Sequence, residues 1–245
     1  MSSKIITFVG QNFIIMRKTL LIISLVAMIV MNGNAQTRDG RFGIKLGPTL
    51  AWASSGSTAA ESKGVGLGYN LGLVYEHYYS SHIAVSSGVT FNALGMKYSF
   101  TDYRFVDDFL EKTNVSVMRR VKAMNVEIPL KVKMKFDVVD SFKAYVEAGG
   151  GVGFNCKDLG RDDYEFYWVS STGEYYHDCT NQYRLLQLSM IFGLGTEFEI
   201  NRKLSAFAQL TFDHGFSNVF VDSLEKQTSS ILRNNYVGLE TGILF

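Results

Sequence analysis

Apolar and polar residues alternate strictly along much of this chain. In the clearest stretch, 124–136, every even position is apolar, from Met124 to Phe136, while the odd positions are polar or proline and include Lys131, Lys133 and Lys135. A period of two is the signature of a β-strand with two different faces. A helix would distribute the lysines around its circumference. The pattern therefore predicts a strand with one apolar face and one charged face.

The same alternation recurs and predicts eight strands in all. Several of them exceed the five or six residues usual in soluble sheets. Strands of ten or more alternating residues suit a tilted crossing of a membrane. The predicted strands are 42–52, 65–79, 83–100, 124–136, 142–154, 186–200, 204–212 and 237–245.

The connections between these strands alternate between short and long. The short ones are 80–82, 138–141 and 201–203, and the long ones are 53–64, 101–122, 155–182 and 217–233. Outer-membrane β-barrels combine tight periplasmic turns with longer outer loops in this way. The barrel must close, because a sheet edge facing lipid would leave backbone groups unsatisfied. We therefore predict an all-β fold: an eight-stranded antiparallel up-and-down transmembrane β-barrel with periplasmic termini.

A soluble eight-stranded barrel is the alternative, with the apolar face turned inward around a ligand. Two features argue against it. The face opposite the apolar one is rich in glycine and in isolated charges, and the chain ends in Ile243-Leu244-Phe245. Phe245 falls on the parity that would face lipid, and it resembles the C-terminal signal by which the barrel-assembly machinery recognises its substrates. The sequence thus predicts lipid contact in a cell outer membrane.

The inward parity of this barrel carries both signs of charge. Bare charges in a narrow lumen are prohibitively costly, whereas paired charges are tolerated. Eight strands enclose an interior just wide enough for side chains to fill. We therefore expect a plugged polar lumen without a solute channel; a proton or substrate site is the alternative. The predicted lumen charge network comprises Lys45, Glu76, Glu127, Lys131, Lys133, Lys135, Lys143, Glu147, Glu197, Glu199, Asp213 and Glu240.

The N-terminal segment has the order of a secretory signal peptide. Met16-Arg17-Lys18 precede an apolar run over 20–31, and Gly33-Asn34-Ala35 offer small residues for cleavage. A membrane anchor is the alternative, but about 12 apolar residues fall short of the ~20 that span a bilayer. We predict a signal peptide at 1–35, with Met16 as the true start, and a barrel domain at 36–245. Removal of the peptide turns a formal net charge of +1 into about −2, because 21 basic residues then face 23 acidic ones.

Composition excludes several other classes of protein. Hydrophobic residues make up 47% of the chain and aromatic residues 13%, which is too apolar for a disordered protein. Two cysteines in 245 residues are too few for a disulfide scaffold. The nearly neutral charge argues against a nucleic-acid partner.

Cys156 and Cys179 lie near the two ends of the longest predicted loop. In an oxidising compartment they would form a disulfide that closes about 24 residues, worth roughly 3 kcal/mol. A metal site is the alternative, but close Cys and His ligands are missing. The loop between the cysteines is acidic and aromatic, which suits either a partner or packing of the loop on itself. The candidate interaction residues are Tyr164, Phe166, Tyr167, Trp168, Tyr175 and Tyr176.

No catalytic motif stands out. His77, His82, His177 and His214 are scattered, and Asp213 and His214, being adjacent in a strand, would point to opposite faces. We predict that the protein is not an enzyme and that it holds neither a metal nor a cofactor.

One strand resembles a known family. The run from Asn125 to Lys133, with its Glu127-Ile128-Pro129-Leu130 core, is similar to the "EIPLLLK" strand of PorT-like outer-membrane β-barrel proteins, and 43–47 resembles their Gly-Ile-Lys-Leu-Gly strand start. The resemblance implies a small outer-membrane barrel. The founding member belongs to the type IX protein secretion machinery, so it also implies an envelope or secretion protein as a partner. Two functions remain open: a structural or interaction protein of the cell envelope, and a small transporter, pore or ligand-binding barrel.

Overall fold

The structure of the protein is a computed structural model, and it describes residues 40–56, 60–102, 115–139, 141–165, 170–172, 176–201, 203–221 and 231–245. The chain divides into two units, 1–40 and 41–245. Apart from Gly40, the described residues all belong to the second unit. The predicted signal peptide, with its proposed start at Met16, lies outside them.

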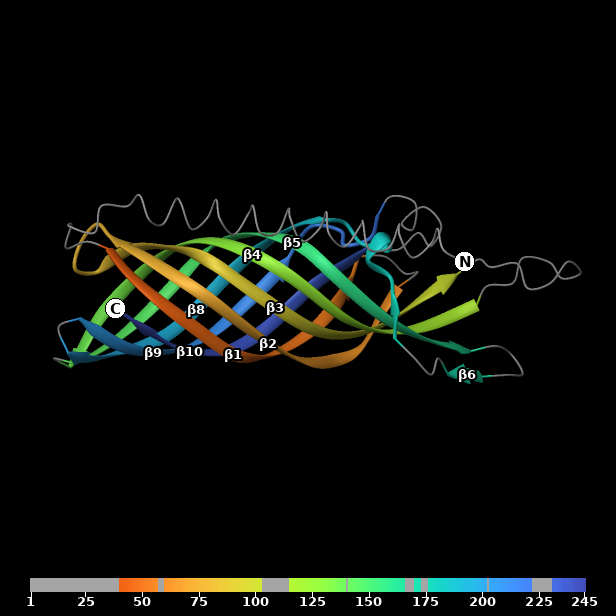
Figure 1. The fold of residues 1–245 in the computed structure, drawn as a ribbon, viewed down its shortest axis with the longest axis horizontal. Coiled ribbons are helices and arrows are strands. Elements are labelled where there is room, and N and C mark those ends of the chain that lie inside the picture. Colours follow the sequence, from red (N-terminus) through yellow and green to blue (C-terminus); the bar gives the residue numbers. More distant parts are fainter. Residues whose placement is uncertain are drawn as a thin grey trace, which may run out of the picture. The chain divides into compact units, whose positions relative to one another are not determined.

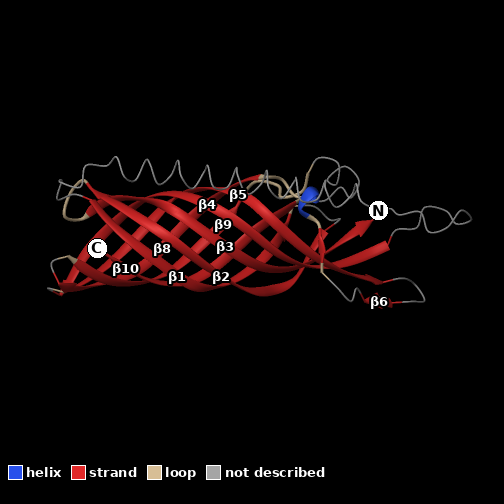
Figure 2. Ribbon diagram, in the orientation of Figure 1, coloured by secondary structure: helices blue, strands red, loops and turns tan. Residues whose placement is uncertain are grey.

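Eight long antiparallel strands form a closed barrel (Figures 1 and 2). Each strand pairs with its neighbours in the chain, β4 with β5 among them. The pairing of the first strand, β1, with the last, β10, closes the barrel. The predicted eight-stranded up-and-down barrel is therefore confirmed. The strands are β1 (Gly40–Ser55), β2 (Ala60–Tyr78), β3 (Ile83–Asp102), β4 (Val115–Val139), β5 (Phe142–Glu165), β8 (Leu186–Asn201), β9 (Leu204–Gly215) and β10 (Leu232–Leu244).

Three short elements lie between β5 and β8. β6 (Ser170–Thr172) and β7 (His177–Asp178) both pair with β5, and they are followed by a single 3-10 turn, η1 (Thr180–Gln182). Among the described residues, no helix is long and apolar enough to cross a membrane.

The two ends of the barrel differ, and we name them the turn end and the extended end. At the turn end the strands are joined by short connections at 79–82, 140–141 and 202–203. At the extended end β4 and β5 reach 25 and 24 residues. The predicted loops 101–122 and 155–182 are therefore partly wrong. Much of both segments continues the sheet, because the β3–β4 ladder runs to Asp102 opposite Val115 and the β4–β5 ladder runs to Glu165 opposite Ser116.

A belt of apolar side chains covers the outside of the barrel. On β4, Leu130 is 63% exposed and Val132 is 53% exposed, whereas their neighbours Lys131 and Lys133 are buried inside. The predicted direction of the two faces is thus observed. Such a belt suits contact with lipid, which solvates apolar side chains as well as a protein core does.

Beyond this belt, towards the extended end, the two faces exchange polarity. Along β4 the inward positions change from the lysines to Val117, Val121 and Ala123, all buried, while Lys122 becomes an exposed outward residue. On β3 the inward residues change from polar to apolar between Asn92 and Leu94. Both changes fall at the same level, since Asn92 pairs with Asn125 and Leu94 pairs with Ala123. The extended end is therefore built like a soluble barrel, apolar inside and charged outside.

Candidate functional site

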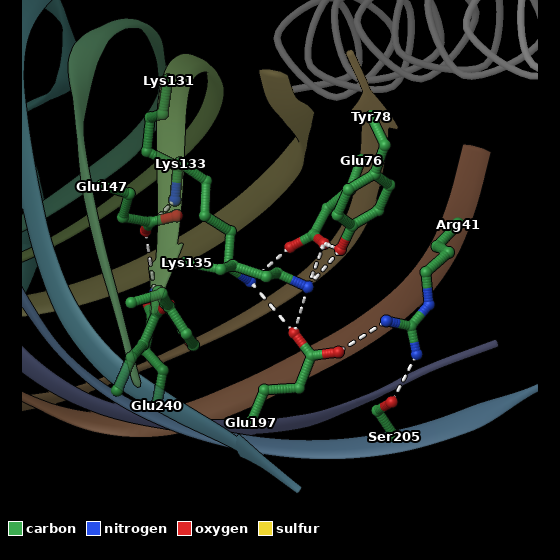
Figure 3. Close-up of polar contacts among 12 residues, drawn as sticks. Arg41, Glu76, Tyr78, Lys131, Lys133, Lys135, Glu147, Glu197, Ser205 and Glu240 are labelled. Atoms are coloured by element: carbon green, nitrogen blue, oxygen red, sulfur yellow. Dashed lines mark hydrogen bonds and ion pairs between the residues drawn. The ribbon is translucent and has the colours of Figure 1, made fainter. Parts of the chain in front are cut away.

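The interior next to the turn end holds most of the predicted charges, and we call it the charged section (Figure 3). Neighbouring strands place these side chains at one level, because inward positions recur every second residue. Lys133 donates to Glu76 at 2.5 Å, and Lys131 pairs with Glu147. All four side chains are at most 7% exposed. Each of these four buried charges thus has an opposite charge within contact distance.

Glu197 on β8 is the centre of this section. Its carboxylate accepts from Lys135 at 2.5 Å and from Arg41 at 2.5 Å, and Lys133 lies 3.7 Å away. Arg41 also donates a hydrogen bond to the Ser205 hydroxyl, and Lys135 also donates to the Tyr78 hydroxyl. Figure 3 shows these cations converging on the one carboxylate.

Glu240 on β10 organises a second cluster. Lys45 donates to its two oxygens at 3.0 and 3.1 Å, Asn70 donates at 2.5 Å and Gln209 donates at 2.6 Å. Gln209 also donates to Glu147 at 3.2 Å, so the Glu240 cluster is linked to the Lys131–Glu147 pair. The remaining lone pairs of a buried carboxylate are satisfied in this way, which is what makes burial of an ion pair tolerable.

Inward glycines make room for the charged side chains. A Cβ atom added at Gly193 would collide with Glu147, and one at Gly195 would lie 2.5 Å from the Tyr145 ring. The glycine rows that the sequence shows on the polar face thus leave space for their large neighbours across the strands.

Four of the twelve predicted network residues form their own groupings at the edges of the section. Lys143 pairs with Glu199 at 2.6 Å at the turn end, where both are partly exposed. Glu127 and Asp213 lie at the other end and form no ion pair within the described part of the chain. Sequence reasoning missed Arg41, Tyr78 and Gln209. Arg41 lies one residue before the predicted strand start, and all three have the inward parity of their strands.

The interior of the extended end is an apolar core, which we call the apolar section. The inward residues Tyr98, Phe100 and Leu232 pack there against Tyr183 and Phe220, which come from the connections after β7 and β9. The ring of Phe220 lies 5.9 Å from that of Tyr98 and 5.6 Å from that of Tyr183. The sequence interpretation, which placed these connections outside the barrel, did not predict this core.

Two polar groups are buried with the apolar section. Arg119 makes two hydrogen bonds to Asp162, at 2.5 and 2.7 Å, and lies 5.0 Å from the centre of the Phe100 ring. Asp158 accepts from Asn155 and has no cationic partner within the described residues. Burial, assisted by the charge of Asp178, raises the pKa of Asp158 to about 6.

The predicted disulfide is absent from the structure, where Cys156 and Cys179 are both free thiols. The β4–β5 register shifts between Asn125–Asn155 and Met124–Lys157, which makes Cys156 the extra residue of a β-bulge. Cys156 is exposed on the outside, whereas Cys179 is buried in the apolar section. The two thiols therefore lie on opposite faces of the sheet. Burial raises the pKa of the Cys179 thiol to about 11.

The candidate interaction residues of the acidic, aromatic loop fall mostly outside the described residues. This applies to Phe166, Tyr167, Trp168 and Tyr175, and to the side chain of Tyr164. Tyr176 is described, is 40% exposed, and lies with its ring 4.6 Å from the Lys122 amino group.

The described residues bring together no group of three or more His, Cys, Asp and Glu side chains that could hold a metal ion. Asp213 is buried inside the barrel and His214 points to the other face, where its Nδ1 lies 2.6 Å from Asn235 Oδ1. This adjacent pair does not form an acid–base couple.

Comparison with known proteins gives one family and a set of similar folds. The profile of the family described as "Outer membrane protein beta-barrel domain" matches residues 34–221. No curated protein sequence matches the chain.

Similar solved structures are outer-membrane barrels of low sequence identity. The outer membrane protease OmpT from Escherichia coli is 9% identical, with 86% of this chain and 97% of that chain covered and a TM-score of 0.50. Neisserial surface protein A is 11% identical, with 83% and 95% covered and a TM-score of 0.44. A major outer membrane protein from Thermus thermophilus is 15% identical, with 84% and 98% covered and a TM-score of 0.42.

Proposed function

Because the chain belongs to the outer membrane protein β-barrel domain family, and so resides in the cell outer membrane, we propose that it is a closed, non-conducting barrel that binds an envelope protein. The observation that carries this proposal is the filled interior. The charged section is occupied by buried ion pairs and the apolar section by packed rings. A cavity between the two sections measures about 30 Å³, which is room for one water molecule but not for a passing solute.

A basic surface outside the barrel supports the interaction role. Lys97, Arg120 and Arg161 are directly opposite one another on β3, β4 and β5, all facing outward. Like charges in such cross-strand positions repel. The carboxylate of Asp163 offsets part of this repulsion, because it lies 3.2 Å from the Arg120 guanidinium and 3.8 Å from that of Arg161. Lys122 and Lys157 add two more exposed lysines beside the row. An acidic segment of an envelope protein fits this surface.

We assign the extended end to the cell exterior, because the longer connections of outer-membrane barrels lie on that side of the membrane. Cys156 offers a direct test, since it is exposed on the outside of the barrel where the apolar belt meets the extended end, while Cys179 is buried. A membrane-impermeant maleimide should label intact cells at Cys156, and a Cys156→Ser variant should not be labelled. Labelling only after cell lysis would show that the extended end faces the periplasm.

Conductance across a planar lipid bilayer tests the closed interior. The purified protein should give no stable openings at the nanosiemens scale. Such openings would contradict the proposal and favour the alternative, a small transporter or pore.

Cross-linking followed by co-purification from mildly solubilised membranes tests the interaction role. The Lys97→Glu/Lys122→Glu/Lys157→Glu variant should lose the partner. Lys203→Glu, an exposed lysine at the turn end, is the matched control and should retain it. Equal recovery with both variants would contradict a role for the basic surface, and cross-links to lipid alone would point to an anionic lipid in place of a protein.

A link to type IX protein secretion rests on the PorT-like resemblance of 125–133. We propose it as the finer role, together with recognition of Phe245 by the barrel-assembly machinery. Phe245 is 60% exposed, and its backbone exchanges hydrogen bonds with Phe42 at 2.9 and 2.7 Å. Deletion of the gene should reduce export of secreted substrates. Unchanged export would remove the secretion role and leave the interaction role standing.

A further inference from the structure

Two buried carboxyl groups face each other at the boundary between the charged section and the apolar section. Glu127 on β4 is 6% exposed and Asp213 on β9 is 5% exposed. The hydroxyl of Ser189 lies between them, 2.9 Å from Glu127 Oε1 and 2.8 Å from Asp213 Oδ2. A Cβ added at Gly151 would collide with Glu127 Oε1, so glycine at that position leaves the carboxyl room to reach this place.

Neither carboxyl group of this pair forms an ion pair with another residue that the structure describes. A serine hydroxyl has one proton and donates to only one carboxylate at a time. Glu127 also accepts from Asn92 at 3.2 Å and from Tyr236 at 3.4 Å, and Asp213 accepts from Ser189. Lys45 is a positive charge near Asp213, but its amino group is held by Glu240 at 3.0 Å. Two buried carboxylates without a cation of their own are strongly unfavourable.

Unused acceptor atoms surround the same place. The side-chain carbonyl oxygens of Asn92, Asn125 and Asn234 are buried, and none of them has a hydrogen-bond donor. These three residues, with Glu127 and Asp213, line the cavity of about 30 Å³. Buried polar atoms are normally satisfied, so a set of acceptors around a cavity calls for a positively charged or donating occupant.

We propose that this cavity is a binding site for one calcium ion. Calcium takes six to eight oxygen ligands, and it accepts carboxylates, amide carbonyls and hydroxyls in flexible arrangements. Glu127 and Asp213 supply the two negative charges that match a divalent ion, and the asparagine carbonyls and Ser189 supply neutral oxygens. Magnesium fits less well, because it demands octahedral geometry and keeps several of its waters. The bound ion would join β3, β4, β8, β9 and β10 at one level.

Titration of the purified, folded full-length chain in detergent micelles with calcium chloride, after treatment with EDTA, tests the site. Isothermal calorimetry should show a single saturable site, and the unfolding temperature should rise with calcium concentration, because a ligand that binds only the folded state stabilises it. Magnesium at the same concentration should have a smaller effect. Absence of both signals, or equal effects of the two ions, would overturn the proposal.

Two variants and a control identify the location. Asp213→Asn and Glu127→Gln should each weaken calcium binding roughly tenfold or more, because affinity follows the number of charged ligands. Glu199→Gln removes an acid outside the cavity and should bind calcium as the unaltered protein does. Heat-dependent gel mobility should show first that each variant is folded. Folded variants that bind calcium unchanged would refute the site, and a stability gain from low pH alone, without a calcium response, would identify a shared proton as the occupant.

Discussion

The charged section and the apolar section stabilise the same barrel by opposite means. In the charged section, Lys133 is 2% exposed and is held between Glu76 and Glu197. In the apolar section, Phe220 is fully buried among aromatic rings and needs no polar partner. The difference follows from the surroundings. Within the apolar belt the outside of the strands must be apolar, so that polar groups collect inside; beyond the belt water solvates the outside, and the interior can pack like a soluble core.

Removal of one central carboxylate should have the largest effect on the free energy of unfolding, because it leaves buried cations of the charged section without an opposite charge. Glu197→Gln leaves Lys135 and Arg41 without their shared anion, and breaking a buried pair costs about 3–5 kcal/mol. Urea unfolding in lipid vesicles, followed by tryptophan fluorescence, measures the loss. Glu199→Gln removes a partly exposed partner at the turn end and should cost less than about 1 kcal/mol. Similar losses in the two variants would contradict the central role of Glu197.

Truncation of a core ring should have the next largest effect, and only in the apolar section. Phe220→Ala leaves a cavity among Tyr98, Phe100 and Tyr183, and it should destabilise the extended end by about 3 kcal/mol. Hydrogen exchange of the backbone should become faster there and stay unchanged in the charged section. The control is Phe216→Ala, a ring that is 48% exposed. Equal loss of protection along the whole barrel would show that the two sections unfold as one.

A smaller effect, present only at high pH, should come from Asp158, a buried acid of the apolar section without a cationic partner among the described residues. Burial raises the pKa of Asp158 to about 6, so the folded state binds a proton more readily than the unfolded state between about pH 4 and pH 6. The free energy of unfolding should therefore fall as the pH rises through this window.

Asp158→Asn removes this penalty while keeping an acceptor for Asn155. It should raise the free energy of unfolding by up to about 3 kcal/mol at pH 8 and by nothing at about pH 3.5, because the pKa is raised from 3.8 to about 6 and one pKa unit corresponds to ~1.4 kcal/mol. Urea unfolding at the two pH values checks the difference. The same gain at both values would mean that the carboxylate is not responsible.

Sequence alone placed many of the charged side chains of the charged section in the interior. Strict alternation gives the direction of each side chain, so that Lys45, Glu240 and the three lysines of β4 could be assigned to the interior. Alternation does not give the partner of each charge, since this depends on the register between strands. Arg41 was missed because the predicted strand starts at 42, two residues after the observed start of β1 at Gly40.

The apolar section could not be predicted from the alternation in the same way. Its inward residues on β4, Val117 and Val121, are apolar, so the alternation changes sense near Met124, and the change resembles the end of a strand. Tyr183 and Phe220 come from connections, where no periodicity indicates direction. The bulge at Cys156 has no pattern of its own either, and this is why the thiols were wrongly paired.

The exchange of polarity along β3 and β4 also fixes how deeply the barrel sits. Lys97 and Lys122 lie just past the apolar belt. A shift that drew them toward the bilayer midplane would cost about 2–4 kcal/mol for each one that reached it. A shift the other way would expose belt residues such as Leu130 to water. The barrel is thus held at one height, and its external surface stays at a constant distance from the lipid headgroups.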